Sequence, residues 1–344
     1  MKKLLTFACS MMLSAGALYA QENLKLNGGG SMGKKAAVPK IEKLAIAQAT
    51  VYFKNATTRE FLKNERGAFG GRKSLGGTVS GRLTAYLETT DGDLTREDYQ
   101  ELADNFYTYL HRKLSSSGIP PVEWSRIATA KFYTADGEPR PETAGDESKK
   151  NGQIYTVVNA NSGNTLYNFN PFGGINPGFA FGKAKRAMGF AEDLGATTAY
   201  LHVVVDFADI ILDGDVHTGE DLGYGPGGVT TITKTKNFSF NAKAGANVKV
   251  AANNGISYFL THKGGSDNIM VVSDISSGIP YASRLSQDEN KAVLKKPIFS
   301  FGKDFKAVPV VVETTKAAYK KAAAAALERY ADQFVTTIVS NRKS

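Results

Sequence analysis

Residues 197–211, TTAYLHVVVDFADII, are the most strand-like stretch of the chain. The odd positions from Ala199 to Phe207 are all apolar, and several even positions are apolar as well. A strand that exposes one face to water alternates apolar and polar residues, whereas a strand covered on both faces is apolar almost throughout. The pattern therefore predicts a long central strand that is covered on both faces.

Helices are predicted on either side of this strand in the sequence. Residues 99–114 carry an apolar residue every three or four positions, after Thr95 and Asp98, which resemble a capping box. A second amphipathic helix covers 182–194 and ends directly before the strand, and an alanine-rich helix covers 315–340. Each helix has one apolar face, so each is expected to pack on the sheet.

The remaining apolar stretches predict more strands. These are residues 44–53, 78–87 and 154–158, followed within a strand-rich part at about 229–301 by 232–240, 256–261 and 269–272. The polar residues 134–152 indicate a surface loop. The order of elements predicts an α/β or α+β fold with a mixed sheet, a long central strand, two or three packing helices and a long C-terminal helix. We expect a single domain over residues 42–344.

The first twenty residues have the features of a signal peptide. Lys2 and Lys3 precede an apolar run that ends before Ala20, and the run is shorter than the roughly 20 residues that a membrane-spanning helix needs. Cys9 is the only cysteine, and it lies inside the run instead of at its end, so lipid attachment is not expected. Cleavage after Ala20 would give a chain that starts at Gln21 and has no thiol. We therefore expect a periplasmic or secreted protein.

Residues 21–41 predict a flexible leader, because three consecutive glycines cannot hold a periodic element. Gly28–Lys34 matches the first seven positions of a phosphate-binding loop, but Lys35 stands where a Ser or Thr is needed and no strand is expected before it. We therefore expect no nucleotide site there.

The net charge of +9 raises the question of nucleic-acid binding. The basic residues are dispersed, and no aromatic and basic stacking motif is present, so nucleic acid is not expected. A protein or an anionic envelope component is the expected partner, and self-association stays open.

Three cations define a candidate anion site. Lys183, Lys185 and Arg186 lie in the first turns of the second helix, after the glycine-rich residues 172–182, where the helix dipole disfavours positive charge. An anion bound at that helix start would reverse the penalty. An ordinary exposed helix face is the alternative.

A candidate calcium site lies just after the central strand. Asp213, Asp215, Glu220 and Asp221 bring carboxylates to what is expected to be an acidic turn, although the spacing departs from the EF-hand pattern. An ordinary turn that ends the strand explains the same residues. No other cofactor is expected.

No sequence motif indicates catalysis. Carboxylates such as Glu192, Asp206 and Asp209 leave open a hydrolase that acts on glycan or peptide.

The order of elements resembles the curli-secretion-channel (CsgG-like) and TolB amino-terminal-like envelope domains. The residues that carry the resemblance are Lys43–Ile46, the helix 99–114 ending in Leu114–Gly118, the helix 184–194 ending in Asp193–Ala196, the strand 197–211, the strands after it and the terminal helix. The resemblance implies a non-enzymatic α/β domain used in envelope assembly or interaction, and it assigns no functional residue. We therefore expect an exported non-catalytic protein that binds or helps assemble another envelope component, with the hydrolase and an adhesive or structural surface subunit as alternatives.

The protein purified from its native envelope is expected to begin at or near Gln21, because signal peptidase cuts after small residues such as Ala20. Intact-mass measurement and thiol titration check this, and the expected result is a chain without Cys9 and without a titratable thiol. A mature chain that retains Met1 or carries lipid on Cys9 contradicts it.

Overall fold

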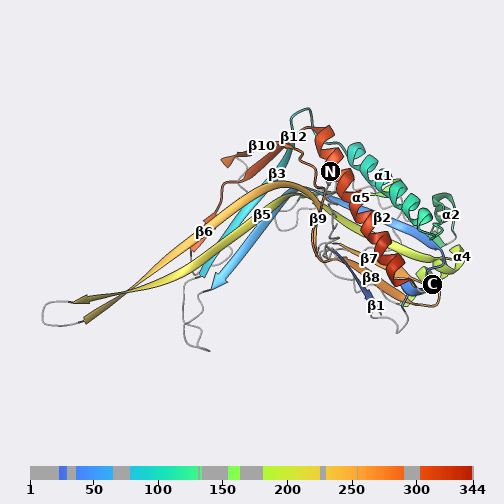
Figure 1. Cartoon of the computed structure of the whole chain (residues 1–344), viewed down its shortest axis with the longest axis horizontal. Coiled ribbons are helices and arrows are strands. Elements are labelled where there is room, and N and C mark those ends of the chain that lie inside the picture. Colours follow the sequence, from blue (N-terminus) through green and yellow to red (C-terminus); the bar gives the residue numbers. More distant parts are fainter. Residues whose placement is uncertain are drawn as a thin grey trace, which may run out of the picture.

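The computed structural model describes residues 23–28, 36–64, 78–130, 132–133, 154–162, 181–224, 230–253, 255–289 and 303–342. In this part of the chain the strands form one mixed sheet with helices packed on it (Figure 1). The structure confirms the predicted fold class, including the long central strand and the long C-terminal helix. The predicted signal peptide, the predicted loop 134–152 and the glycine-rich residues 172–180 lie outside the described residues.

Twelve strands belong to the sheet. They are β1 (Leu24–Gly28), β2 (Leu44–Asn64), β3 (Thr78–Thr89), β4 (Ile154–Asn159), β5 (Thr197–Tyr224), β6 (Thr230–Val250), β7 (Ile256–Leu260), β8 (Ser266–Val271), β9 (Ile275–Ser276), β10 (Ala282–Gln287), β11 (Lys303–Lys306) and β12 (Val310–Thr314). The helices are α1 (Arg96–Ser116), α2 (Trp124–Ala128), α4 (Phe181–Leu194) and α5 (Lys316–Asn341), with short 3-10 turns η1 (Val38–Lys40) and η2 (Ala160–Ser162).

The main path through the sheet is β1-β8-β7-β5-β2-β3-β12-β10, so β5 and β2 are central. β2 and β5 run parallel, with Leu44 to Phe53 beside Thr197 to Val205. β2 also pairs antiparallel with β3 and β4, and β5 also pairs antiparallel with β6 and β7. The prediction of a central strand is confirmed.

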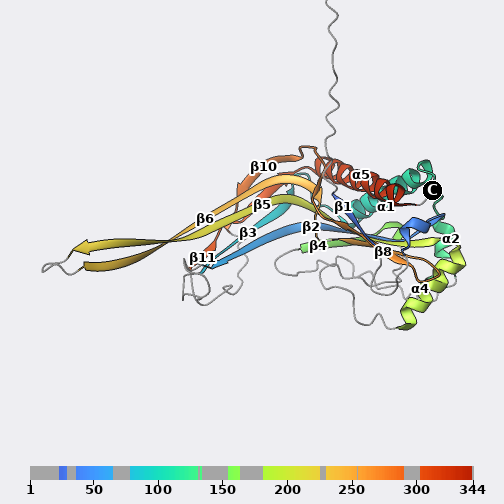
Figure 2. The same cartoon turned by 60° about the horizontal axis from the view of Figure 1, so that its bottom comes forward.

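Helices cover both faces of the sheet. α1 and α5 lie side by side on one face, and α2 and α4 lie on the opposite face at the far end (Figures 1 and 2). The odd residues of β5 from Ala199 to Phe207 join the core beneath α1 and α5, whereas Tyr200 packs with α2 and α4. Because both sets are buried, the strand is apolar on both faces, as its sequence indicates.

The ends of the long helices follow from their capping residues. Thr95 and Asp98 form the predicted capping box at the start of α1. Thr315 caps α5 by accepting a hydrogen bond from the backbone N–H of Ala318. The predicted apolar stripe of α1 is buried against the sheet and α5. None of the described helices combines the length and the apolar character needed to cross a membrane.

Three predicted strand ends are wrong. β5 continues to Tyr224, β2 to Asn64 and β6 to Val250, well past the expected ends at 211, 53 and 240. The expected flexible leader also contains ordered structure, because β1 pairs antiparallel with β8 and buries Leu24. The N–H groups of Ala37 and Val38 donate to the buried carboxylate of Asp267 at 2.7 and 2.6 Å, which holds the start of η1. These contacts lie far apart in sequence, so local composition did not predict them.

Val203→Asp is expected to prevent folding, because Val203 has no exposed surface and an unpaired carboxylate there costs several kcal/mol. Ile211→Asp is the matched control, since the same strand exposes Ile211 by 64%. Urea unfolding of the two variants measures the difference. A Val203→Asp variant that unfolds like Ile211→Asp contradicts the central position of β5.

Candidate interaction site

β5 and β6 extend beyond the rest of the sheet as a two-stranded arm (Figure 1). We define the arm as residues 206–224 of β5 and 230–249 of β6. Pairing continues along it from Asp206↔Lys249 to Tyr224↔Thr230. Within the described residues, no strand pairs with the outer edge of β5 past Val205, and β6 has only β9 on its outer edge, at Lys249 and Val250. Both outer edges of the arm therefore present backbone N–H and C=O groups.

A β-bulge lies at the base of the arm. Asp206 pairs with Lys249 and Ala208 pairs with Ala246, so the single residue Phe207 faces two residues of β6. A bulge bends the strand that carries it and increases its twist. The hydroxyl of Tyr281 donates to the carbonyl of Phe207 and holds the bulge against the body.

Three ion pairs, made by two lysines, hold the arm base. Lys54 Nζ lies 2.6 Å from Asp206 Oδ2, and both side chains are buried. Lys249 pairs with Asp209 and, at 2.5 Å, with Asp274. Burial by itself would lower the pKa of Lys249, but its hydrogen bonds to the two carboxylates outweigh burial and raise the pKa. Lys249 therefore stays charged and links β6 to β5 and to the segment before β9.

Further along, the arm packs on the β2–β3 hairpin. The rings of Phe61 and Phe240 stack with centroids 5.7 Å apart and an interplanar angle of 7°. Gly81 and Gly214 lie under these rings, and a Cβ built on either glycine would overlap ring atoms. The two glycines therefore allow the hairpins to approach closely.

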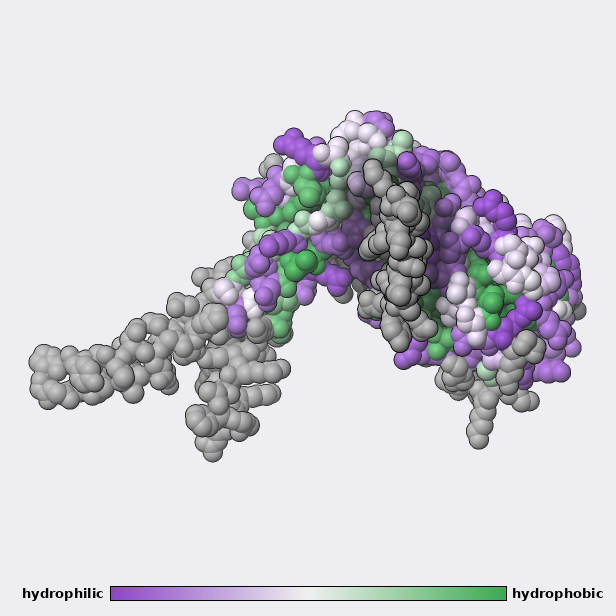
Figure 3. Space-filling view, in the orientation of Figure 1, coloured by the Kyte–Doolittle hydropathy of each residue, from purple (hydrophilic) through white to green (hydrophobic). Residues whose placement is uncertain are grey.

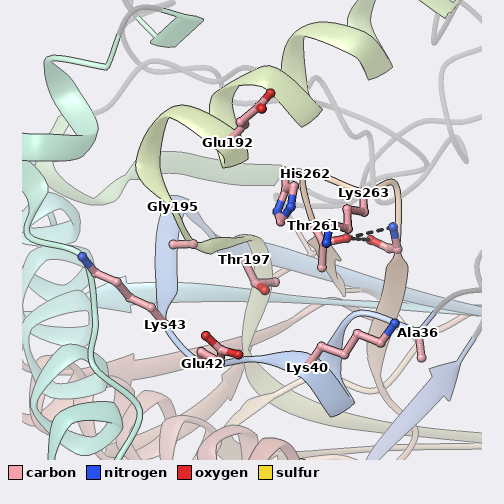
Figure 4. Close-up of a pocket in the computed structure, with 12 residues that line it drawn as sticks. Ala36, Lys40, Glu42, Lys43, Glu192, Gly195, Thr197, Thr261, His262 and Lys263 are labelled. Carbon is pink, nitrogen blue, oxygen red and sulfur yellow. Dashed lines mark hydrogen bonds between the residues drawn. The ribbon is translucent and has the colours of Figure 1, made fainter.

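A pocket of about 410 Å³ lies at the other end of the body (Figure 4). Its lining comes from η1 and the residues before β2, from the junction of α4 with β5, and from the β7–β8 turn. The polar side chains among the lining residues are Lys40, Glu42, Lys43, Glu192, Thr197, Thr261, His262 and Lys263. Three chain segments that are distant in sequence form this pocket, so sequence periodicity did not reveal it.

The predicted anion residues lie at the start of α4. Lys185 and Arg186 are exposed there, while the side chain of Lys183 is outside the described part of the structure. The anion site stays a prediction.

The predicted acidic turn is wrong, because Asp213, Asp215, Glu220 and Asp221 lie along strand β5. Asp213 and Asp221 are eight residues apart, which corresponds to roughly 26 Å along a strand. A strand in place of a turn does not gather these residues, and the calcium site stays a prediction.

The carboxylates considered for hydrolysis do not come together. Asp206 and Asp209 are engaged by lysines at the arm base, and Asp206 is buried. Glu192 lines the distant pocket. His202 is buried beside Tyr52, and burial lowers its pKa to about 4. These residues do not form a carboxylate pair in a cleft.

The arm itself was missed by sequence reasoning, although a signal for it exists. Asp213, Asp215, His217 and Asp221 stand at odd positions, and Gly225–Gly228 contains the turn residues expected between two strands. A period of two follows in residues 231–240 of β6. Turn residues followed by this alternation indicate a hairpin.

Comparison of the chain with protein-family models, curated proteins and solved structures gives no match.

Gly81→Ala is expected to destabilise the protein by about 1 to 3 kcal/mol, because its Cβ would displace the stacked rings of Phe61 and Phe240. Gly245→Ala, also in a strand of this region, is the control, since a Cβ there meets no atom within 4 Å. Urea unfolding compares the two. Equal stability of both variants would show that the hairpins do not pack in this way.

Proposed function

We propose that the chain is an exported, non-catalytic envelope protein that binds or helps assemble another envelope protein through the arm. The observation that carries the proposal is that β5 and β6 continue as a pair past the body while both outer edges lack strand partners among the described residues. Open strand edges recruit extended segments of other chains through backbone hydrogen bonds.

The stability of a hairpin supports this role. An isolated two-stranded hairpin is marginally stable in water, so a partner strand or a covering face stabilises it. The contact of Phe61 with Phe240 covers the arm as far as the pair Gly214 and Phe240. Pairing with another molecule would stabilise the rest of the arm.

Apolar residues are exposed on several strands of the sheet. Leu62 of β2, Ile211 of β5 and Leu285 of β10 are 46%, 64% and 47% exposed. Apolar patches are visible around the arm base (Figure 3). Apolar groups rimmed by polar ones are common at protein interfaces. They would add contact area to the backbone pairing at the edges.

The non-catalytic part of the proposal rests on the carboxylates. Asp206 and Asp209 already neutralise lysines at the arm base, so neither is free to act as an acid or a base. The resemblance to the CsgG-like and TolB amino-terminal-like domains and the signal-like residues 1–20 support the envelope as the place of action.

Shortening the arm tests the proposal. Residues 216–238 are replaced by Asn-Gly, which joins the paired residues Asp215 and Ser239 by a two-residue turn and keeps Phe240. We expect the shortened protein to fold, because the core lies in the body. We also expect it to run at monomer size on native gels of envelope extracts, whereas the full-length protein runs in a larger assembly.

Site-specific crosslinking supplies the control. A photo-reactive residue at Asp215, in the arm, is expected to yield one discrete crosslinked protein, and the same residue at the exposed Glu328 of α5 is expected to yield none. An unchanged assembly size after shortening, or crosslinks from Glu328 alone, would refute the arm as the binding site.

A further inference from the structure

The pocket at the end of the body opposite the arm has features that the proposed function does not use (Figure 4). We propose that it binds a small zwitterion, that is, a free α-amino acid or a short peptide with both termini free. The volume of about 410 Å³ falls in the range of small-molecule sites. The features that support it are a hydroxyl of the lining, the charges around that hydroxyl and a turn that is already closed.

Thr197 supplies a hydroxyl to the pocket lining. The residue is 6% exposed, and its side chain makes no hydrogen bond with any residue in the described ranges. Its backbone N–H donates to the carbonyl of Lys43 at 3.0 Å, which fixes the residue at the start of β5. A hydroxyl can both donate and accept hydrogen bonds, so it could bond to either end of a ligand in the pocket.

The β7–β8 turn forms a wall with its backbone groups already satisfied. The N–H of Thr261 donates to the carbonyl of Gly265, and the N–H of Gly264 donates to the carbonyl of Thr261. The N–H of Gly265 donates to Thr261 Oγ1. This wall therefore needs no rearrangement before binding, and side chains instead of backbone groups would recognise a ligand.

Both signs of charge line the pocket. Lys40 and Lys263 lie on the side formed by η1 and the β7–β8 turn, and Glu192 lies on the side formed by α4 (Figure 4). Within the described ranges, none of these three side chains forms an ion pair. The C-terminal end of α4, at Gly195, adds the negative end of the helix dipole to the side of Glu192.

The distribution of charges in the lining favours a zwitterion over a simple anion or a simple cation. A simple anion near the lysines would also face Glu42 and Glu192, and a simple cation would face Lys40, Lys43 and Lys263. A molecule with a carboxylate and an ammonium group can place each beside the opposite charge. Thr197 lies between these sides and can bond to either end group (Figure 4).

Isothermal titration of the full chain with L-alanine and with the dipeptide Ala-Ala tests the proposal. We expect saturable binding of at least one probe, and a loss of at least tenfold in affinity when its amine is acetylated or its carboxylate is amidated. Thr197→Val, which keeps the side-chain shape and removes the hydroxyl, is expected to weaken binding by at least fivefold. The exposed Lys321→Gln variant of α5 is the matched control and should bind as the parent does.

Glu192→Gln and Lys263→Gln provide variants at exposed positions that are expected to fold. The first should weaken binding of amidated alanine, which keeps only the ammonium group, and the second should weaken binding of acetylated alanine. Three results would overturn the proposal. Neither probe binds saturably at 10 mM, blocking either end group leaves the affinity unchanged, or inorganic phosphate binds more tightly than both probes. The arm is intact in every variant, so these outcomes are independent of the proposed function.

Discussion

The parallel pairing of β2 with β5, from Leu44 beside Thr197 to Phe53 beside Val205, is the contact on which the rest of the structure depends. Up to that point the two strands share one sheet that α1 and α5 cover. Past it, β2 continues with β3 and β5 continues with β6. Because a strand has only two edges, this change of partners divides the sheet into two hairpins, of which the β5–β6 hairpin becomes the arm.

The division of the sheet creates a place where charged residues are buried. Lys54 and Asp206 directly follow the last paired residues, Phe53 and Val205, and they meet at 2.6 Å where the strands separate. A buried ion pair contributes little net stability relative to apolar packing, but removing one partner leaves an uncompensated charge. The pair therefore ties the first residue of the arm to β2, and Lys249 ties the facing strand to Asp274 on the body.

The arm and the pocket lie at opposite ends of one strand. Thr197, the first residue of β5, lines the pocket, and Asp206 begins the arm nine residues later, roughly 30 Å along the strand. The two sites share β5 but no side chain. A ligand in the pocket and a partner on the arm would therefore contact separate surfaces of one continuous element.

Local patterns in the sequence determined the helices, the central strand and the fold class. The stripe of α1, the capping box at Thr95 and the apolar run around Val203 are each set by residues close together in the chain, and a packed face requires them wherever the element lies. Only the tertiary structure decided the length of the arm, the pairing of β1 with β8 and the pocket around Thr197. Each of these depends on segments that are distant in sequence, and alternation or charge within one segment does not specify its partner. The acidic residues after Ile211 illustrate the reason: their composition suits a turn, but pairing with β6 makes them part of a strand.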